Sequence, residues 1–311
     1  MPTIGRFLQR PQFLRSSDQE RGMADSSHNA IEFGDEADTA ERVTPGSARS
    51  LLLTLLGEFV VREDRPVWTA TLLHALEGVG VAEKAARQAI ARAATAGWIE
   101  NARDGRRASW SLTTRGRELI AAGSLRVKSL AGEAWNGHWL VLHLSLPETH
   151  RTMRVKAYRA LSWLGFGNPS PALWVNPHVN RQGETKAVLA ELGLSGVAFG
   201  FVGKSFDLGV SDAELAQRAW NLDAVSEHYR ELASTFQKMR PRSDDAILFA
   251  HVQLVNQLQR LPYIDPGLPD ILLPAGWQGR QDAAKLGAIR ARWQDAAHAR
   301  WTELTGTAPA R

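Results

Sequence analysis

Long polar side chains recur every three or four residues between residues 82 and 96. At roughly 100° per residue, a helix here would gather them in one arc of about 140°, opposite an arc of small apolar residues. The polar arc holds Lys84, Arg87, Gln88, Ala91, Arg92 and Thr95. Cationic and amide side chains on one helix face can read base edges in the DNA major groove. A solvated amphipathic helix is the alternative interpretation of this segment taken alone.

The next segment is typical of a β-hairpin with a cationic tip. Asp104-Gly105 separates two runs with strand-like composition, and Asp-Gly is a favoured two-residue hairpin turn. This turn predicts that Arg103 pairs with Arg106, and that Ile99 lies opposite Trp110. The expected phosphate contacts come from three side chains, Arg103, Arg106 and Arg107.

The preceding residues predict the helices that must hold this polar helix in place. Ser47 is a suitable N-cap for a helix with a leucine-rich stripe that reaches Phe59, and a second helix follows Thr69. A closing helix is expected over 114–122, ended by Gly123. Helix, helix, polar helix and hairpin is the order of a winged helix-turn-helix, in which the third helix reads bases and the wing contacts phosphate.

The rest of the chain predicts an α+β region and then a helical region. Strands are expected at 139–146, 173–175 and 197–202, with helices at 148–163 and 184–193 between them. This alternation favours a ferredoxin-like sandwich. Further helices are expected at 213–222, 224–239, 244–261 and 280–304.

Charge is distributed unevenly along the 311 residues. Residues 1–44 hold 5 basic and 8 acidic residues, whereas residues 45–128 hold 13 and 8. We therefore predict a disordered acidic tail over 1–44, a winged-helix DNA-binding domain over 45–128, a ferredoxin-like domain over 129–210 and a helical domain over 211–311. The absence of cysteine fits a reducing cytoplasm, and no apolar run predicts a membrane span.

From Ser47 onward the chain resembles the PaaX family of bacterial transcriptional repressors. The resemblance rests on ordered motifs: SARSLLLTLLGEF from Ser47, Arg87 and Arg92 before Gly97-Trp98, Gly105-Arg106-Arg107 with Leu112-Thr113, Trp135-Asn136-Gly137-His138-Trp139, Leu164-Gly165-Phe166-Gly167, Ala219-Trp220-Asn221-Leu222, and the Asp265 to Trp277 elbow. One departure is Ala93, at a position usually occupied by leucine.

The resemblance implies a homodimer that binds a palindromic operator on double-stranded DNA and represses a phenylacetate-type operon. It also implies release by an aryl-CoA thioester or a related aromatic metabolite. Some of the 11 tryptophans could line a pocket for a planar ring, and arginines of the first central helix could contact CoA phosphates. The candidate effector residues are Arg151, Arg154, Arg159, Trp163, Trp174 and Trp220; core packing and a solvated helix face are the alternatives.

The family's central domain is similar to small CRISPR-associated nucleases, which carry a metal-binding Asp at the end of the first strand. The corresponding run here, 142–146, holds no carboxylate. Lys204-Ser205 ends a weak likeness to a phosphate-binding loop, but a poor helix start follows. We therefore predict no catalytic residues, no cofactor and no metal site. A metal-dependent nuclease, a CoA-handling enzyme and an activator without a small ligand stay as alternatives.

Overall fold

The computed structural model describes residues 46–104, 107–128, 134–206 and 208–306. Its mixture of helices with two small sheets confirms the predicted α+β class. All of these described residues belong to one compact unit. No helix among these described residues is long and apolar enough to span a bilayer. The predicted tail over 1–44 lies outside the described residues.

The first helices form around a leucine-rich stripe. Helix α1 (Ala48–Leu55) begins at Ser47, whose Oγ accepts a hydrogen bond from the amide of Ser50 at 3.2 Å. The chain continues through a π-helical turn, η2 (Leu56–Val60), into the short helix α2 (Val61–Glu63). The predicted apolar stripe is buried throughout. Three further helices complete this region: α3 (Thr69–Gly78), α4 (Glu83–Thr95) and α5 (Thr114–Lys128). Helix α5 continues past Gly123, where the sequence predicted its end.

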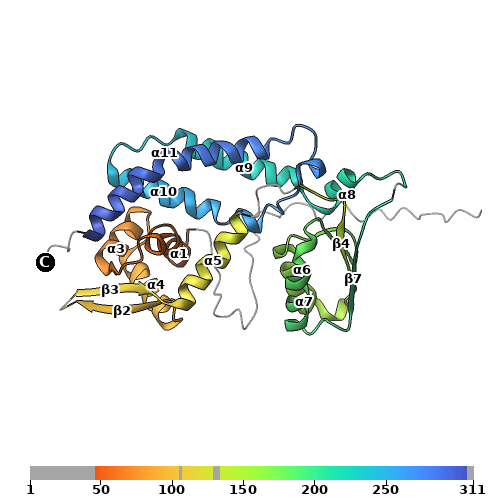
Figure 1. The fold of residues 1–311 in the computed structure, drawn as a ribbon, viewed down its shortest axis with the longest axis horizontal. Coiled ribbons are helices and arrows are strands. Elements are labelled where there is room, and N and C mark those ends of the chain that lie inside the picture. Colours follow the sequence, from red (N-terminus) through yellow and green to blue (C-terminus); the bar gives the residue numbers. More distant parts are fainter. Residues whose placement is uncertain (1–45, 105–106, 129–133, 207, 307–311) are drawn as a thin grey trace, which may run out of the picture. The chain divides into compact units, whose positions relative to one another are not determined.

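One strand before α3 and two strands after α4 form a three-stranded sheet in the order β1-β3-β2. Its strands are β1 (Val67–Trp68), β2 (Ile99–Asp104) and β3 (Arg107–Leu112). Figure 1 shows β2 and β3 below the helices of this region. The hairpin was predicted, but its predicted register was wrong. Ile99 pairs with Leu112, and Asp104 pairs with Arg107. Because Ile99 and Leu112 are both buried, this register brings two core side chains together, whereas the predicted one would not.

The middle region runs in the order β4-α6-β5-β6-α7-β7. Its elements are β4 (Trp139–Leu144), α6 (Arg151–Trp163), β5 (Gly167–Ser170), β6 (Leu173–Asn176), α7 (Gln182–Glu191) and β7 (Ala198–Gly203), with single 3-10 turns at η3 (Glu148–His150) and η4 (Val179–Arg181). All pairings in its sheet are antiparallel, in the order β5-β6-β4-β7. The sequence missed β5, which carries Pro169; proline is tolerated at such an edge.

Strand β4 is apolar except at His143, and each of its faces is covered over at least part of its length. Leu140, Leu142 and Leu144 pack with α6 and α7 residues in one core. On the other face, Trp139 packs with residues that include Ala216 of α8 (Asp212–Ala219). A nearly continuous apolar run is the pattern expected of a strand that is largely buried on both sides.

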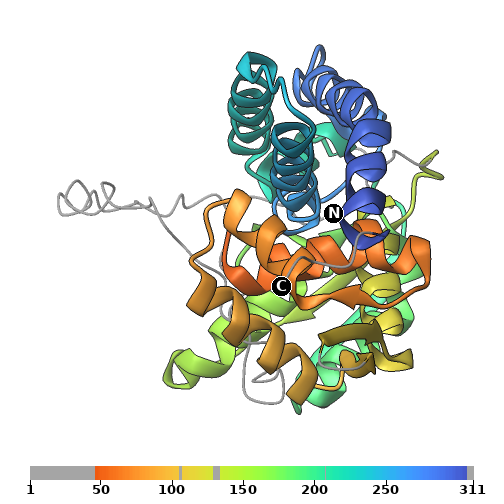
Figure 2. The same ribbon diagram turned by 90° about the vertical axis from the view of Figure 1, so that its left-hand side faces the viewer.

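Three long helices lie side by side after α8 (Figures 1 and 2). They are α9 (Leu222–Lys238), α10 (Asp244–Leu258) and α11 (Gly279–Gly306), with the 3-10 turns η5 (Leu261–Tyr263) and η6 (Asp270–Leu272) between the last two. Side chains of Ser211, Asn221 and Ser243 cap α8, α9 and α10 by accepting backbone N–H bonds. These caps fix the helix starts close to the predicted positions.

The first helical region packs directly against α10 and α11. Phe59 stacks on Trp301 with ring centroids 4.7 Å apart, and Leu248 and Val252 of α10 join the same core. At the far end, Thr71 Oγ1 and Trp68 Nε1 donate to the carbonyls of Leu304 and Thr305. The last turn of α11 is therefore tied to the region that carries α4.

Candidate functional site

The exposed face of α4 carries the polar residues that the sequence assigned to it. Lys84, Arg87, Gln88 and Arg92 are all exposed, whereas Ala86, Ala89 and Ala93 on the opposite face are buried. Small buried residues let the helix axis lie close to its neighbours while the long side chains project outward. The face is therefore available for recognition, and contact of these four residues with DNA stays a prediction.

One of these cations has an acidic neighbour on the same helix. Arg87 Nε donates to Glu83 Oε1 at 2.7 Å, and the two side chains are spaced i,i+4. Both are more than half exposed, so the pair contributes well under about 1 kcal/mol and is easily exchanged for another anion. A phosphate could replace Glu83 at little cost.

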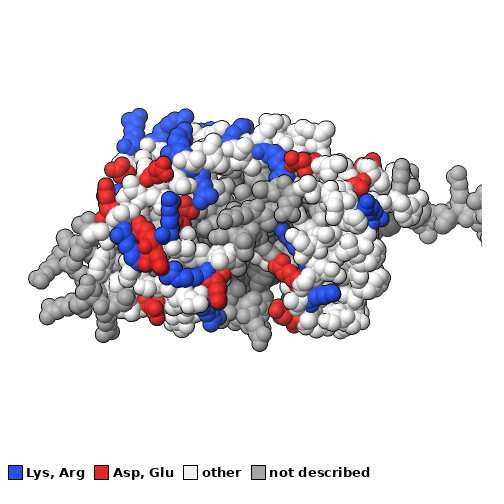
Figure 3. Space-filling model, in the orientation of Figure 1, with Lys and Arg blue, Asp and Glu red and all other residues white. Residues whose placement is uncertain are grey.

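The hairpin beside α4 carries the remaining predicted contacts. Arg103 lies in β2 and pairs with Ala108, and Arg107 begins β3. Arg106 lies outside the described residues. Figure 3 shows Lys and Arg mixed with Asp and Glu over the face of the molecule that it presents. The charged side chains described on this face therefore do not form a patch of one sign.

Backbone contacts hold the hairpin base against the end of α4. Thr113 Oγ1 donates to the carbonyl of Gly97 at 2.6 Å, and Gly116 of α5 lies against the carbonyl of Trp98. A Cβ on Gly116 would lie 2.1 Å from that oxygen, which is closer than side-chain carbons approach backbone. Glycine is therefore required at 116 for α5 to pack on the turn between α4 and β2.

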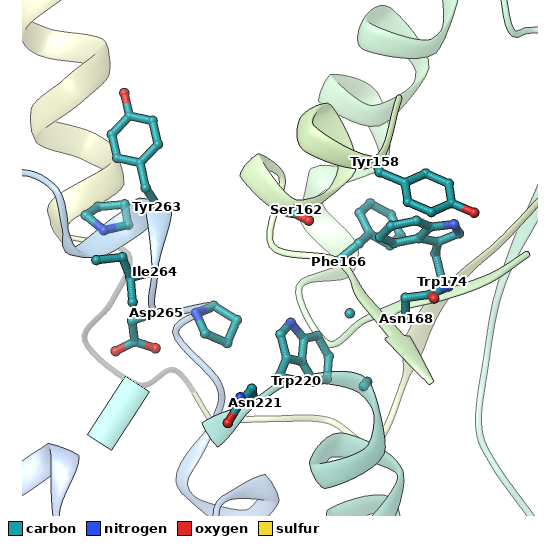
Figure 4. Close-up of a pocket in the computed structure, with 14 residues that line it drawn as sticks. Tyr158, Ser162, Phe166, Asn168, Trp174, Trp220, Asn221, Tyr263, Ile264 and Asp265 are labelled. Carbon is teal, nitrogen blue, oxygen red and sulfur yellow. The ribbon is translucent and has the colours of Figure 1, made fainter. Parts of the chain in front are cut away.

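An aromatic cavity of about 330 Å³ lies where the middle region meets the segment after α10 (Figure 4). Tyr158 and Ser162 of α6, Phe166, and Trp174 of β6 line one side; Trp220 lies between them and the segment Pro262–Pro266. Gly167 makes room for Trp220, because a Cβ there would lie 2.4 Å from the indole ring. The size and lining are those of a small-molecule site.

Two tryptophans that line this cavity have indole nitrogens without hydrogen-bond acceptors among the described residues. These nitrogens are the buried Nε1 atoms of Trp174 and Trp220, and Trp174 as a whole is 3% exposed. An indole N–H can only donate, and a buried donor without a partner costs stability. The aromatic lining suits a flat ring, and two buried N–H groups beside it are without acceptors among the described residues.

The charges around the cavity favour a neutral acceptor. No Lys, Arg or His is among the described residues that line it, and one carboxylate, Asp265, is. Asp265 is buried and accepts hydrogen bonds from the Tyr229 hydroxyl and the Gly267 amide, both at 2.8 Å. Burial, together with the nearby Asp265 charge, raises the pKa of Tyr229 well above its ordinary range, so this hydroxyl stays a donor. A free carboxylate would meet a like charge here.

The predicted effector residues separate into three groups in the structure. Trp174 and Trp220 line the cavity. Trp163 lies outside its lining and packs on Tyr263, which does line it. Arg151, Arg154 and Arg159 lie on α6 outside the cavity; by their spacing, Arg151 and Arg154 share a helix face with Tyr158 and Ser162. The sequence analysis missed Tyr158, Phe166 and the 262–266 segment as site residues, although the Asp265 to Trp277 elbow motif begins inside that segment.

A buried polar cluster joins three helices that are distant in sequence. Glu58 Oε1 lies 2.9 Å from His251 Nε2 and 3.5 Å from His298 Nε2, and Arg290 donates to both carboxylate oxygens. Burial alone would raise the pKa of Glu58, but hydrogen bonds from both histidines and the Arg290 charge hold it well below its ordinary value. Sequence spacing could not reveal this cluster.

The ligand-type atoms of Glu58, His251 and His298 lie within 4.8 Å of one another, close enough to surround a metal ion. The prediction of no metal site did not anticipate this grouping. Arg290 already neutralises the carboxylate, and we interpret the cluster as an ion-pair network that fastens η2 to α10 and α11.

The other chemical motifs occupy exposed loops and a covered strand. Lys204 and Ser205 follow β7 without a helix, since α8 begins only at Asp212. A phosphate-binding loop requires a helix N-terminus directly after the motif, so this segment lacks that geometry. His143 in β4 stacks on Phe199, with no carboxylate in that strand.

Three family descriptions match successive parts of the chain. Residues 47–116 match "PaaX-like protein", residues 132–215 match "PaaX protein central Cas2-like domain" and residues 220–303 match "PaaX-like protein C-terminal domain". Together they define a class of three-part proteins with a Cas2-like centre. The chain belongs to the PaaX family.

Two similar proteins give this assignment context. The chain is 29% identical over 251 residues to "Transcriptional repressor PaaX" of Escherichia coli (strain K12), which covers 77% of this chain and 78% of that protein. Among solved structures, "Uncharacterized protein Rv0674 from Mycobacterium tuberculosis" is similar with a TM-score of 0.57 and 20% identity, covering 82% of this chain and 98% of that one. The latter likeness shows a shared fold.

Proposed function

We propose that the protein is a cytoplasmic, sequence-specific repressor of an aromatic-compound, phenylacetate-type catabolic operon. The observation that carries the proposal is the α4 face, with Lys84, Arg87, Gln88 and Arg92 exposed over a buried alanine face. The name of the Escherichia coli relative supports the repressor role. As a homodimer, the protein would bind the two halves of a palindromic operator, with one α4 in each major groove.

The domain interpretation follows the same three parts. The order α1, α3, α4, β2 and β3 supports a winged helix-turn-helix over 45–128, with Arg103, Arg106 and Arg107 on the wing. The β4-α6-β5-β6-α7-β7 order and its all-antiparallel sheet support a ferredoxin-like domain over 129–210. The helices from α8 onward support a helical domain over 211–311.

The aromatic cavity is the proposed effector site, and an aryl-CoA thioester is the proposed effector. Its carbonyl would accept from the indole N–H groups of Trp174 and Trp220, and its ring would pack against the surrounding aromatic side chains. A neutral thioester suits a cavity with Asp265 and no cation better than the free acid does. Arg151 and Arg154 lie about 6–10 Å from Tyr158 along the axis of α6. At that distance they would contact the CoA phosphates that extend out of the cavity. Arg159 lies on the same helix.

One titration tests both parts of the proposal. Fluorescence anisotropy should show that the protein prefers DNA from its own promoter to a scrambled duplex of equal length, and that phenylacetyl-CoA, but not phenylacetate with CoA, releases it. Equal affinity for both duplexes would remove sequence-specific repression. Specific DNA binding that no thioester alters would exclude an aryl-CoA thioester as the effector. Hydrolysis of the thioester by the protein would support the alternative of a CoA-handling enzyme.

A further inference from the structure

A second cavity, of about 340 Å³, lies between the α4-bearing region and the last helices. One wall comes from α1, η2 and α5, including Leu53, Gly57 and Ile120; the other comes from α10, η5 and α11, including Leu258 and Arg290. Elsewhere these two sets of elements pack closely, as in the Phe59–Trp301 stack. This cavity is therefore an opening in an otherwise packed interface.

The polar lining of this cavity carries more positive than negative charge. Arg260 and Arg290 face it with one carboxylate, Glu58, and Glu58 is already bound by Arg290. Arg260 is half-buried, and the acceptor it has is the neutral Gln257 Oε1 at 3.3 Å. Its burial, with no carboxylate partner among the described residues, lowers the pKa of Arg260. A half-buried guanidinium of this kind lacks its usual counter-ion.

One donor without an acceptor and one side-chain amide also border this cavity. The Arg290 Nε is buried without an acceptor among the described residues. Gln259 presents its amide group to the cavity while its Oε1 accepts from Thr54. The remaining lining is largely apolar and includes Leu53, Leu119 and Leu258. An apolar pocket with cationic donors at one end matches an amphipathic anion.

We propose that this cavity binds a small organic carboxylate with an apolar body, held by Arg260 and the free edge of Arg290. The volume accommodates an arylalkanoate. Its two arginines distinguish its ligand class from that of the aromatic cavity, which has no cation among its described lining residues. Binding to the protein stands independently of the proposed function. The proposal concerns ligand binding between the α4-bearing region and the last helices, and release of DNA stays with the thioester of the proposed function.

The π-helical turn η2 packs against α5 beside the second cavity. A Cβ on Gly57 of η2 would lie only 3.3 Å from Ile120 Cγ2 of α5, so α5 and η2 are in close contact beside the opening. Single π-helical turns inside α-helices are rare and frequently occur at functional sites. A ligand that fills the opening would fix α5, which follows the hairpin directly, relative to α10.

The test uses calorimetry on the full chain without DNA, with phenylacetate as probe and phenylacetamide as its neutral isostere. We expect phenylacetate to bind and the amide to bind at least tenfold more weakly. Arg260→Gln should weaken phenylacetate binding at least tenfold, whereas Arg242→Gln, an exposed arginine outside the cavity, should leave it unchanged. Equal binding of acid and amide, or no binding at millimolar concentration, would overturn the proposal.

Two further variants distinguish loss of the site from a folding defect and show which of the two cavities binds phenylacetate. Leu119→Trp fills the second cavity from an exposed position and should abolish phenylacetate binding while Arg260 is kept. Trp220→Phe alters the aromatic cavity and should leave phenylacetate binding intact. Loss of phenylacetate binding in Trp220→Phe but not in Leu119→Trp would place the acid in the aromatic cavity and overturn the proposal.

Discussion

The rings of Trp163 and Tyr263 lie with their centroids 4.0 Å apart, inclined by 36°. Trp163 ends α6, whereas Tyr263 ends η5 and borders both the aromatic cavity and the second cavity. This contact is therefore a shared wall through which occupancy of one cavity can change the other.

The first prediction concerns that shared wall. Tyr263→Ala should weaken binding of both phenylacetyl-CoA and phenylacetate, because it removes part of each lining. Trp174→Phe should weaken only the thioester. Calorimetry with each ligand checks this, and a Tyr263→Ala protein with one affinity unchanged would show that the two cavities are independent.

The second prediction concerns the α4 face. If Arg92 reads a base, Arg92→Ala should reduce affinity for the operator by about 1–3 kcal/mol, with little effect on scrambled DNA. Glu83→Gln should act in the opposite direction, because it frees Arg87 and removes a negative charge near phosphate. Anisotropy titrations at several salt concentrations measure both effects. If neither variant changes the affinity for the operator, the exposed face of α4 does not contact the DNA.

The third prediction concerns the indole donors of the aromatic cavity. Trp220→Phe keeps a flat ring but removes the N–H group, so it should raise the phenylacetyl-CoA concentration needed for DNA release by about tenfold, corresponding to a hydrogen bond of about 1.4 kcal/mol. Affinity for DNA without thioester should stay the same. Unchanged release would show that this N–H does not contact the ligand.

The fourth prediction concerns pH and the Glu58 cluster. Since the pKa of Glu58 is lowered in the folded protein, the ion pairs contribute fully above its ordinary value of 4.5 and are lost as pH falls below it. Glu58→Gln should cost about 3–5 kcal/mol near neutral pH, because it leaves Arg290 and the histidines without their carboxylate. The wild type should lose stability more steeply than this variant between about pH 5 and pH 3.

Chemical denaturation at each pH measures this difference. Glu77→Gln, at an exposed position, is the matched control and should follow the wild type. Parallel pH profiles for the wild type and Glu58→Gln would contradict the assignment of the ion pairs.

The fifth prediction uses two glycines of the same helix, α5. Gly116→Ala should destabilise the protein by about 1–3 kcal/mol and weaken DNA binding, because its Cβ would meet the Trp98 carbonyl at 2.1 Å. Gly123→Ala meets nothing within 4 Å and should stabilise by up to about 1 kcal/mol. Thermal unfolding of the pair separates steric contact from helix propensity, and equal changes would show that α5 does not pack as described.

The helices and most strands could be predicted because local patterns specify them. The alternation of polar residues and alanine fixed which face of α4 is exposed, and Ser47 marked the start of α1. Strand β5 was missed because it is four residues long and carries Pro169, and the hairpin register was missed because turn preference competed with burial of Ile99 and Leu112. In that hairpin, burial decided the register.

The sequence by itself determined the exposed cationic face of α4 and the order of elements around it, since both depend on spacing within a few turns. Only the tertiary structure decided where the sites lie. Trp174, Trp220 and Pro266 line one cavity, and Glu58 contacts His251 and His298. Arg260 faces a second cavity without a carboxylate partner among the described residues. These groupings depend on which distant segments pack together, and no local periodicity records that choice.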